Sequence, residues 1–186
     1  MAEGAAEGQP RTEGPRVFLD TCVLFPPILR DFLLGLADAG LFMPLWSQSV
    51  LAEWLHVTAR KGEAGAPEAI ARITARWPEA MAPDGAPELL DLPDAGDTHV
   101  LAAAIAGQAD ILLTLNLRDF PKWATAPQGI HAQAPDPFVM DLWLQDAIRV
   151  EGQVVRVWPA LEGRPLRNAL KRARLPRLGK ALEQGG

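Results

Sequence analysis

The stretch Val100 to Pro121, VLAAAIAGQADILLTLNLRDFP, decides how this chain folds. It begins Ala-rich and apolar, as a buried helix does, and continues into the apolar run Ile111 to Leu115, which has the length of a buried strand. A buried helix that leads into a buried strand is typical of parallel sheets. Ligands collect where such strands end. We therefore expect Asn116 and Asp119 at a functional edge, with Asp97 at the start of the preceding helix.

The same alternation extends over most of the chain. Short apolar runs predict strands, and amphipathic stretches with good N-terminal residues, such as Pro27 and Ser47, predict helices. The sequence therefore predicts an α/β fold, a parallel sheet flanked by helices. The expected strands are 16–20, 41–46, a weak one at 88–92, 111–115 and an edge strand at 130–133, and the expected helices between them are 27–40, 47–60, 67–81 and one that starts near residue 97.

The composition changes after residue 135. Helical patterns are expected at 136–150, 152–161 and 165–175, and half of the chain's 18 Lys and Arg residues lie beyond residue 138. We interpret this part as a basic helical extension of one domain. The expected organisation is a flexible N-terminus at 1–15, a main α/β domain at 16–138 and the extension at 139–186. The basic residues are Arg149, Arg156, Arg164, Arg167, Lys171, Arg172, Arg174, Arg177 and Lys180.

Composition excludes several classes of protein. With Cys22 as its only cysteine, the chain has no disulfide framework and no thiolate zinc cluster. Residues 1–15 lack the apolar core of a signal peptide, and no apolar run approaches the length of a membrane span, so we expect a cytoplasmic protein without a membrane partner. The net charge of -5 gives no overall attraction to nucleic acid, but the local distribution of charge matters more than the sum.

Four acidic side chains have a common expected location. They are Asp20 after the first strand, Glu53 on the second long helix, Asp97 at a helix start and Asp119 after a later strand. Clustered carboxylates repel one another, and a divalent cation relieves that repulsion. Oxygen ligands without His or Cys favour Mg²⁺ or Mn²⁺ over zinc, and such a cation favours hydrolysis of phosphodiester bonds.

Four motifs in this order resemble those of the PIN-domain nucleases, and within them the VapC-type toxins of bacterial toxin–antitoxin pairs, in a longer subgroup with a C-terminal helical extension. The resemblance spans residues 16–138 and implies a Rossmann-like sheet and a metal-dependent endoribonuclease. It also implies an RNA substrate, a cognate antitoxin that covers the site, and a homodimer. The motifs are VFLDTCVL at 17–24, Glu53 with Trp54, DTHVLAAA at 97–104 and LTLNLRDF at 113–120.

The resemblance also implies roles for single residues. Asp20, Glu53, Asp97 and Asp119 would bind the metal, and Asn116 would hold a water or a neighbouring carboxylate. The chain departs from the family two places after its first aspartate. A small polar residue is common there, and this chain has a cysteine, Cys22. We therefore expect that Thr21 supports Asp20 instead, or that the support of Asp20 is weaker than in other family members.

Three further residues are candidates for auxiliary roles. Asp94 is a substitute for Asp97 or an additional acid, His99 contacts phosphate or positions a water, and Arg118 contacts the substrate backbone or pairs with a carboxylate. Each has a structural alternative as a helix cap, an exposed side chain or an ion pair. The same holds for the main acids, because Asp and Glu also cap helices and cover exposed faces.

The sequence disfavours two other enzyme classes that act on phosphate compounds. A haloacid-dehalogenase-like phosphatase requires an aspartate where Cys22 stands, and a nucleotide-binding Rossmann enzyme requires a glycine-rich turn where 21–27 has no glycine. A non-catalytic PIN-like module that binds RNA or protein stays open, and so does a DNA nuclease.

Overall fold

The structure, a computed structural model, describes residues 14–184, so the predicted flexible segment at 1–15 lies almost wholly outside it. In chain order the principal elements are β1 (Arg16–Leu19), α1 (Thr21–Leu24), α2 (Pro27–Asp38), β2 (Met43–Ser47), α3 (Gln48–Lys61), α4 (Ala66–Arg76), β3 (Met81–Ala82), α5 (Thr98–Ala106), β4 (Ile111–Leu113), α6 (Lys122–Thr125), β5 (His131–Gln133), α7 (Pro135–Gln145), α8 (Ala147–Val157), α9 (Gly163–Arg172) and α10 (Pro176–Gln184). Four short 3₁₀ turns, η1 (Pro78–Ala80), η2 (Pro87–Leu89), η3 (Ala95–Asp97) and η4 (Ala126–Gln128), complete the described part.

A five-stranded parallel sheet in the order β3-β2-β1-β4-β5 forms the centre. Phe18 of the middle strand pairs with Leu45 of β2 and Leu112 of β4. Because all strands are parallel, their carboxyl ends lie at one edge, where the polar residues after β1 and β4 come together. The predicted α/β fold with a parallel sheet flanked by helices is confirmed.

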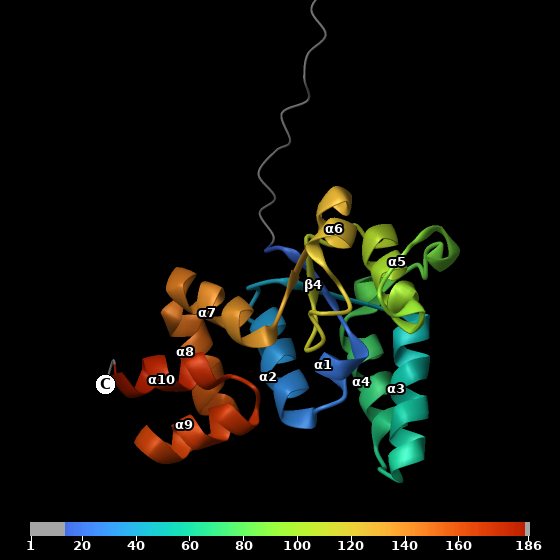
Figure 1. Cartoon of the computed structure of the whole chain (residues 1–186). Helices are drawn as coiled ribbons and strands as arrows, with labels where there is room; N and C mark the ends of the chain where they lie inside the picture. Colours follow the sequence, from blue (N-terminus) through green and yellow to red (C-terminus); the bar gives the residue numbers. More distant parts are fainter. Residues whose placement is uncertain (1–13, 185–186) are drawn as a thin grey trace, which may run out of the picture.

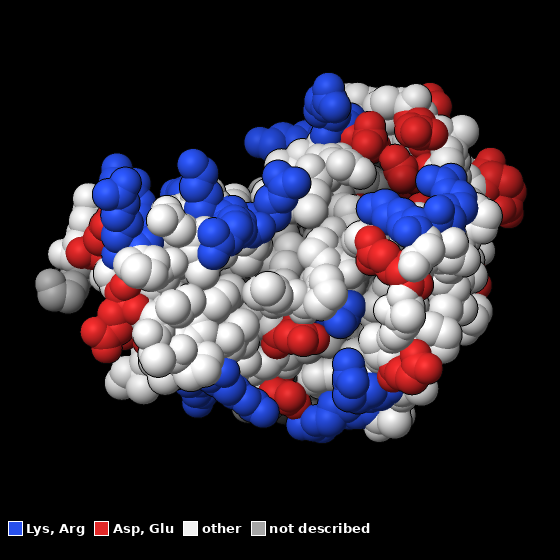
Figure 2. Space-filling model, turned by 90° about the horizontal axis from the view of Figure 1, so that it is seen from below, with Lys and Arg blue, Asp and Glu red and all other residues white. Residues whose placement is uncertain are grey.

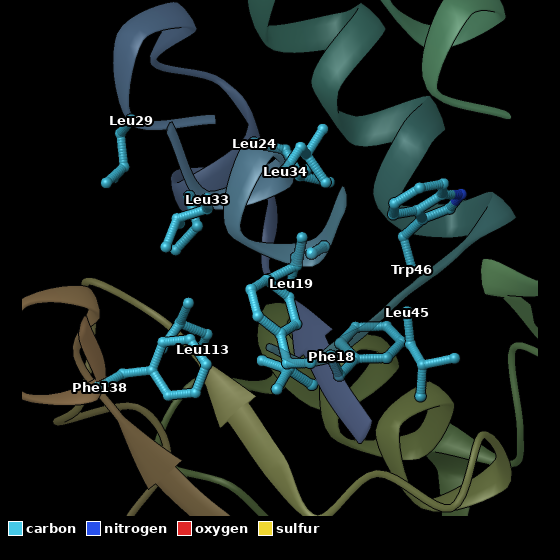
Figure 3. Packing of buried hydrophobic residues seen from close by; sticks show 14 of the residues in the cluster. Phe18, Leu19, Leu24, Leu29, Leu33, Leu34, Leu45, Trp46, Leu113 and Phe138 are labelled. Carbon is cyan, nitrogen blue, oxygen red and sulfur yellow. The ribbon is translucent and has the colours of Figure 1, made fainter. Parts of the chain in front are cut away.

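Helices cover both faces of this sheet. In Figure 1, α3 and α5 lie on one side, and α2 lies on the other together with α7 to α10. The apolar core joins the sheet to these layers, with Phe18, Leu113 and Phe138 among its members (Figure 3). The ring of Phe138, from α7, meets that of Phe42 edge-on at 5.3 Å, so the first C-terminal helix packs directly on the sheet domain.

Several local predictions are confirmed. Helix α2 begins at Pro27, where the missing N–H group costs no hydrogen bond. Ser47 caps α3, since its hydroxyl accepts a hydrogen bond from the N–H of Val50 at 3.3 Å. Asp97 directly precedes α5, and β5 lies within the predicted edge strand. Trp54 is 2% exposed and belongs to the core.

The prediction of a strand at 88–92 is wrong. Pro87 begins a 3₁₀ turn there, and the edge strand is the two-residue β3, which pairs with Trp46 and Ser47. The helix expected at 67–81 ends at Arg76, because Pro78 disfavours the helical conformation of the residue before it. This early end leaves Met81 free to join the sheet.

The predicted C-terminal helices are only partly correct. The stretch 136–150 is not one helix, because Asp146 interrupts it and its carboxylate caps α8 by accepting from the N–H of Arg149 at 3.1 Å. Gly152 lies inside α8 and starts no helix, and α8 ends at Val157, just before the Trp158–Pro159 pair. The predicted helix at 165–175 corresponds to α9, whereas α10 was not predicted.

A buried carboxylate fixes α10 to the rest of the molecule. Asp136 on α7 is 8% exposed and accepts hydrogen bonds from the backbone N–H groups of Arg177 and Leu178 at 3.0 and 3.3 Å. A carboxylate at a helix N-terminus satisfies N–H groups that have no partner within the helix. Within residues 14–184, no helix combines the length and the apolar character needed to cross a membrane.

Candidate catalytic site

The predicted acidic residues come from four separate segments of the fold. Asp20 follows β1, Glu53 lies in the second turn of α3, Asp97 ends the 3₁₀ turn before α5, and Asp119 lies in the loop after β4. The sheet order brings the first and last of these together, because β1 and β4 are neighbours. Each of the other three acts electrostatically on Asp97, so all four share one environment.

Asp20 is the most enclosed of the four, at 5% exposure. Its Oδ2 accepts hydrogen bonds from the Thr114 hydroxyl at 2.7 Å and the Cys22 thiol at 3.0 Å, and its N–H donates to the Leu113 carbonyl at 3.1 Å. Burial raises the pKa of Asp20, and the hydrogen bonds from Cys22 and Thr114 oppose that rise. The carboxylate is therefore fixed in orientation between β1 and β4.

Thr114 and Cys22 support the Asp20 carboxylate through their side chains. Thr114 is fully buried at the end of β4. The Cys22 sulfur also accepts the N–H of Leu115 at 3.1 Å, so the thiol joins α1 to the end of β4. Burial and the nearby Asp20 carboxylate raise the pKa of the Cys22 thiol, which keeps it protonated as a donor.

Thr21 supports Asp20 through its backbone, whose hydrogen bond lowers the pKa of Asp20, while its hydroxyl points to a different acid. The Thr21 hydroxyl donates to Glu53 Oε2 at 2.5 Å, and His99 Nε2 lies 3.4 Å from the same oxygen. His99 Nδ1 is 2.7 Å from the Gly96 carbonyl, which only accepts, so Nδ1 carries a proton. Glu53 is therefore not a freely solvated surface side chain, because residues of α1 and α5 both contact its carboxylate.

The Glu53–His99 pair shifts both groups towards their charged forms. The hydrogen bond from His99 lowers the pKa of Glu53, against the opposing effect of burial. The hydrogen bond to Glu53 raises the pKa of His99, again against burial. A protonated imidazole donates from Nδ1 to the Gly96 carbonyl and forms an ion pair with Glu53 through Nε2 at 3.4 Å.

Asp97 shows the mutual effect of the acids most clearly. Burial, followed by the charges of Asp20, Asp119, Asp94 and Glu53, raises its pKa to about 6. Like charges at short range make ionisation of the next carboxyl unfavourable. The site therefore carries more negative charge than its own side chains neutralise.

The loop after β4 supplies the remaining candidates. The Asn116 N–H donates to the Thr114 hydroxyl at 3.0 Å, and its carbonyl accepts the N–H of Asp119 at 3.0 Å in a tight turn. The side chains of Asn116 and Arg118 are exposed at the rim of the site. Asp94 is exposed as well, and its Oδ1 caps the turn before α5 by accepting the N–H of Gly96 at 2.8 Å.

The comparisons with known proteins now identify the family. The model of the PIN domain matches residues 16–118, which is more than half of the chain. The chain belongs to the PIN-domain family. Within this PIN protein, 45 residues are 47% identical to "Putative ribonuclease VapC50" of Mycobacterium tuberculosis (strain ATCC 25618 / H37Rv). That match covers 24% of the chain and 27% of the curated relative's length. No solved structure matches the chain significantly.

The donor set of this PIN domain fits a hard divalent cation, which is the usual cofactor of PIN nucleases. Its acids offer oxygen only, and the raised pKa of Asp97 shows repulsion that a cation would relieve. Among residues 14–184, no three His, Cys, Asp or Glu side chains already converge closely enough to hold a metal. The acids that would coordinate the cation lie close enough to interact electrostatically. Within the described residues, however, their side chains do not converge on a common coordination point.

Proposed function

We propose that this PIN-domain protein is a metal-dependent endoribonuclease and the toxin of a type II toxin–antitoxin pair. The observation that carries the proposal is the meeting of four acids, Asp20, Glu53, Asp97 and Asp119, which arrive from separate segments of the fold at the carboxyl edge of the sheet and, together with burial, raise the pKa of Asp97. A purely structural carboxylate at a helix start is stabilised in its charged form by the helix dipole. The charged form of Asp97 is instead destabilised by burial and by the neighbouring acids, as expected of a site that takes up positive charge.

Asp20, Glu53, Asp97 and Asp119 would hold the cation, Mg²⁺ or Mn²⁺. When bound, such a cation supplies Lewis-acid activation of water and neutralises charge on the phosphate. The protein fixes the orientation of the carboxylates that would bind the cation. Thr114 and Cys22 fix the Asp20 carboxylate, and the Thr21 hydroxyl and His99 ring hold Glu53 from two sides.

The rim of the site would bind the substrate. Arg118 is exposed between Asn116 and Asp119, where its guanidinium would pair with a phosphate of RNA next to the bond that is cleaved. The Asn116 side chain is exposed in the same turn and would hold the attacking water through its amide group. Both side chains project from a turn whose backbone is fixed by the buried Thr114 hydroxyl.

The proposal includes two protein partners. A cognate antitoxin would block the acidic site with an Arg or Lys side chain, because that site has an excess of negative charge. A second copy of the chain would cover the apolar side chains left exposed on α7 and α8, namely Leu144, Ile148 and Val155 at 74, 86 and 66% exposure. Patches of this kind mark interaction surfaces. The mass of the purified protein in solution tests the homodimer directly.

The first experiment is cleavage of pooled RNA by the purified wild-type protein with Mn²⁺, with EDTA, and with Asp97→Asn or Asp20→Asn in place of wild type. We expect cleavage only by the wild type with Mn²⁺, and a single-stranded DNA pool in parallel separates RNA from DNA. Folded variants that cleave as the wild type does would overturn the assignment. Binding of RNA without cleavage under any metal would favour the non-catalytic module.

A further inference from the structure

The C-terminal extension carries a surface of uncompensated positive charge. The segment from Gly163 to Lys180 contains seven Lys and Arg residues and no Asp or Glu, although the whole chain has a net charge of -5. All seven side chains are exposed. In the described part of the chain, an ion pair is seen for one of the seven, Arg167 with Glu183 at 2.6 Å. We call these residues the α9–α10 surface: Arg164, Arg167, Lys171, Arg172, Arg174, Arg177 and Lys180.

This surface has a fixed position on the domain. Helices α9 and α10 pack against each other, and the buried Asp136 on α7 accepts the N–H groups of Arg177 and Leu178 at the start of α10. The basic side chains are thus attached to the same rigid body as the sheet. They are not carried on a free tail.

Two hollows lie along α9, and both have basic rims. One, of about 400 Å³, is lined by three basic residues, Arg164, Arg167 and Lys171, together with Asn168 and with Glu183, the ion-pair partner of Arg167. The other, of about 530 Å³, has Arg172 and Arg174 at its edge and an apolar wall that includes Trp158 and Leu161. A basic rim beside an apolar wall is the arrangement by which proteins bind single-stranded nucleic acid, since the rim meets phosphates and the wall meets bases.

One residue of the α9–α10 surface, Arg174, has a backbone conformation that is unfavourable for an arginine. Its φ is +66°, in the left-handed region, at the turn that ends α9. Glycine is the usual residue at such a helix end, because every other side chain is strained there. Gln108 and Ala160 also have positive φ among the described residues, so this conformation reflects the tight turn, and Arg174 contributes to the surface through its exposed charge.

The surface lies on the same side of the molecule as the acidic site. The strands run downward in Figure 1, so the view from below in Figure 2 faces their carboxyl ends. Figure 2 shows a row of Lys and Arg side chains over the C-terminal helices and a group of acidic side chains on the other half of the same face, with a hollow between the two halves, although each half also carries some side chains of the opposite charge. One strand of nucleic acid would therefore reach both.

We propose that the α9–α10 surface binds the sugar–phosphate backbone of the RNA substrate and holds it across the hollow towards the acidic site. This inference rests on the proposed function, since it takes the substrate to be RNA. In this proposal the C-terminal extension provides most of the affinity for RNA, because the acidic site without a cation would repel phosphate. Binding is then independent of sequence and depends strongly on salt.

The test measures binding without cleavage. Fluorescence anisotropy of a labelled 20-nucleotide RNA of mixed sequence is followed in EDTA, with Asp97→Asn as the parent protein. The test variant adds Arg164→Gln, Lys171→Gln and Arg172→Gln. The matched control adds Arg60→Gln, Lys61→Gln and Arg72→Gln, which remove the same charge from α3 and α4. Circular dichroism and melting confirm that both variants fold.

We expect the test variant to raise the Kd at least tenfold and to reduce the slope of log affinity against log salt by about 2, because each lost phosphate contact of a single strand contributes about 0.7. The control should change the Kd less than twofold. If both variants change the Kd for RNA equally, the proposal is overturned, and an acidic protein becomes the better candidate ligand of the α9–α10 surface. Because no cleavage is measured, failure of the nuclease assay and failure of this binding assay are separate results.

A single substitution separates binding from stability. Arg174→Gly relieves the left-handed backbone, so it should raise the melting temperature while it weakens RNA binding. An unchanged Kd for this variant would contradict the role of Arg174. A structural role for the side chain would instead lower the melting temperature.

Discussion

Replacing Asp97 by Asn is expected to stabilise the metal-free protein while it abolishes cleavage. The pKa of Asp97 is raised from 3.8 to about 6 by burial and by the neighbouring acids. A shift of that size corresponds to about 3 kcal/mol between the charged and neutral forms. Because Asp97 is only partly buried, solvent screens much of this energy, and we expect Asp97→Asn to stabilise the fold by about 1 kcal/mol at pH 8.

The dependence on pH gives the sign of this effect. A raised carboxyl pKa means that the folded state holds its proton more tightly than the unfolded chain does, so stability falls as the pH rises from about 4 through about 6. The variant lacks this titration. Its advantage over the wild type should therefore be full above pH 7 and absent below pH 4.

Thermal unfolding in EDTA between pH 4 and pH 8 measures the effect. About 1 kcal/mol corresponds to about 2–4 °C in a chain of this length. Asp91→Asn, at an exposed position outside the set of acids that raise the pKa of Asp97, is the matched control and should shift the melting temperature by less than 1 °C or so. Added Mn²⁺ should stabilise the wild type more than the Asp97→Asn variant, by preferential binding to the folded state. An Asp97→Asn variant that melts below the wild type at pH 8 would refute the reasoning.

Three further predictions follow from single contacts. Thr114→Val keeps the shape of the side chain but removes a hydrogen bond to the buried Asp20, so urea unfolding at pH 7 should show a loss of about 1.5–3 kcal/mol; an unchanged midpoint would mean that the bond contributes nothing. The raised pKa of Cys22 predicts that a disulfide reagent at pH 8 modifies the thiol far more slowly in the native protein than in urea, and equal rates would contradict this. Gly35→Ala should cost about 1–3 kcal/mol, because its Cβ would clash with the buried side-chain amide of Gln153 where α2 meets α8. Gly152→Ala, at a helix position with open space around it, is its control and should be neutral or slightly stabilising.

The sheet and its order of helices were predictable because their signals are local. The apolar runs at β1 and β4, the cap at Ser47 and the proline at the start of α2 are each visible in a short window of sequence. The edge strand β3 was not, since two residues carry no periodicity and only the early end of α4 places them beside β2. The break at Asp146 was missed for the opposite reason, because helical periodicity continues on both sides of a capping residue.

The acids of the site were predictable as residue types at the ends of elements, whereas their supporting contacts were not. Which hydroxyl reaches which carboxylate depends on how α1 sits between β4 and α3. Thr21 and Cys22 are neighbours in sequence, yet one points to Glu53 and the other to Asp20. Thr114 carried a usable signal, a polar residue within an apolar strand that is fully buried in the fold. A buried hydroxyl must find a partner, and the partner here is Asp20.

The acids of this site are in different electrostatic states, and that difference has a consequence for how a cation would bind. Glu53 has a lowered pKa because His99 and Thr21 donate to it, whereas Asp97 has a pKa of about 6 because burial and the charges of neighbouring acids disfavour its ionised form. A divalent cation requires the ionised form of each ligand, so binding near pH 6 would release a proton from Asp97. Mn²⁺ affinity measured by calorimetry should therefore rise between pH 5 and pH 7 and then level off. An Asp97→Asn protein should lack that proton release, and an equal release from both proteins would show that another group titrates.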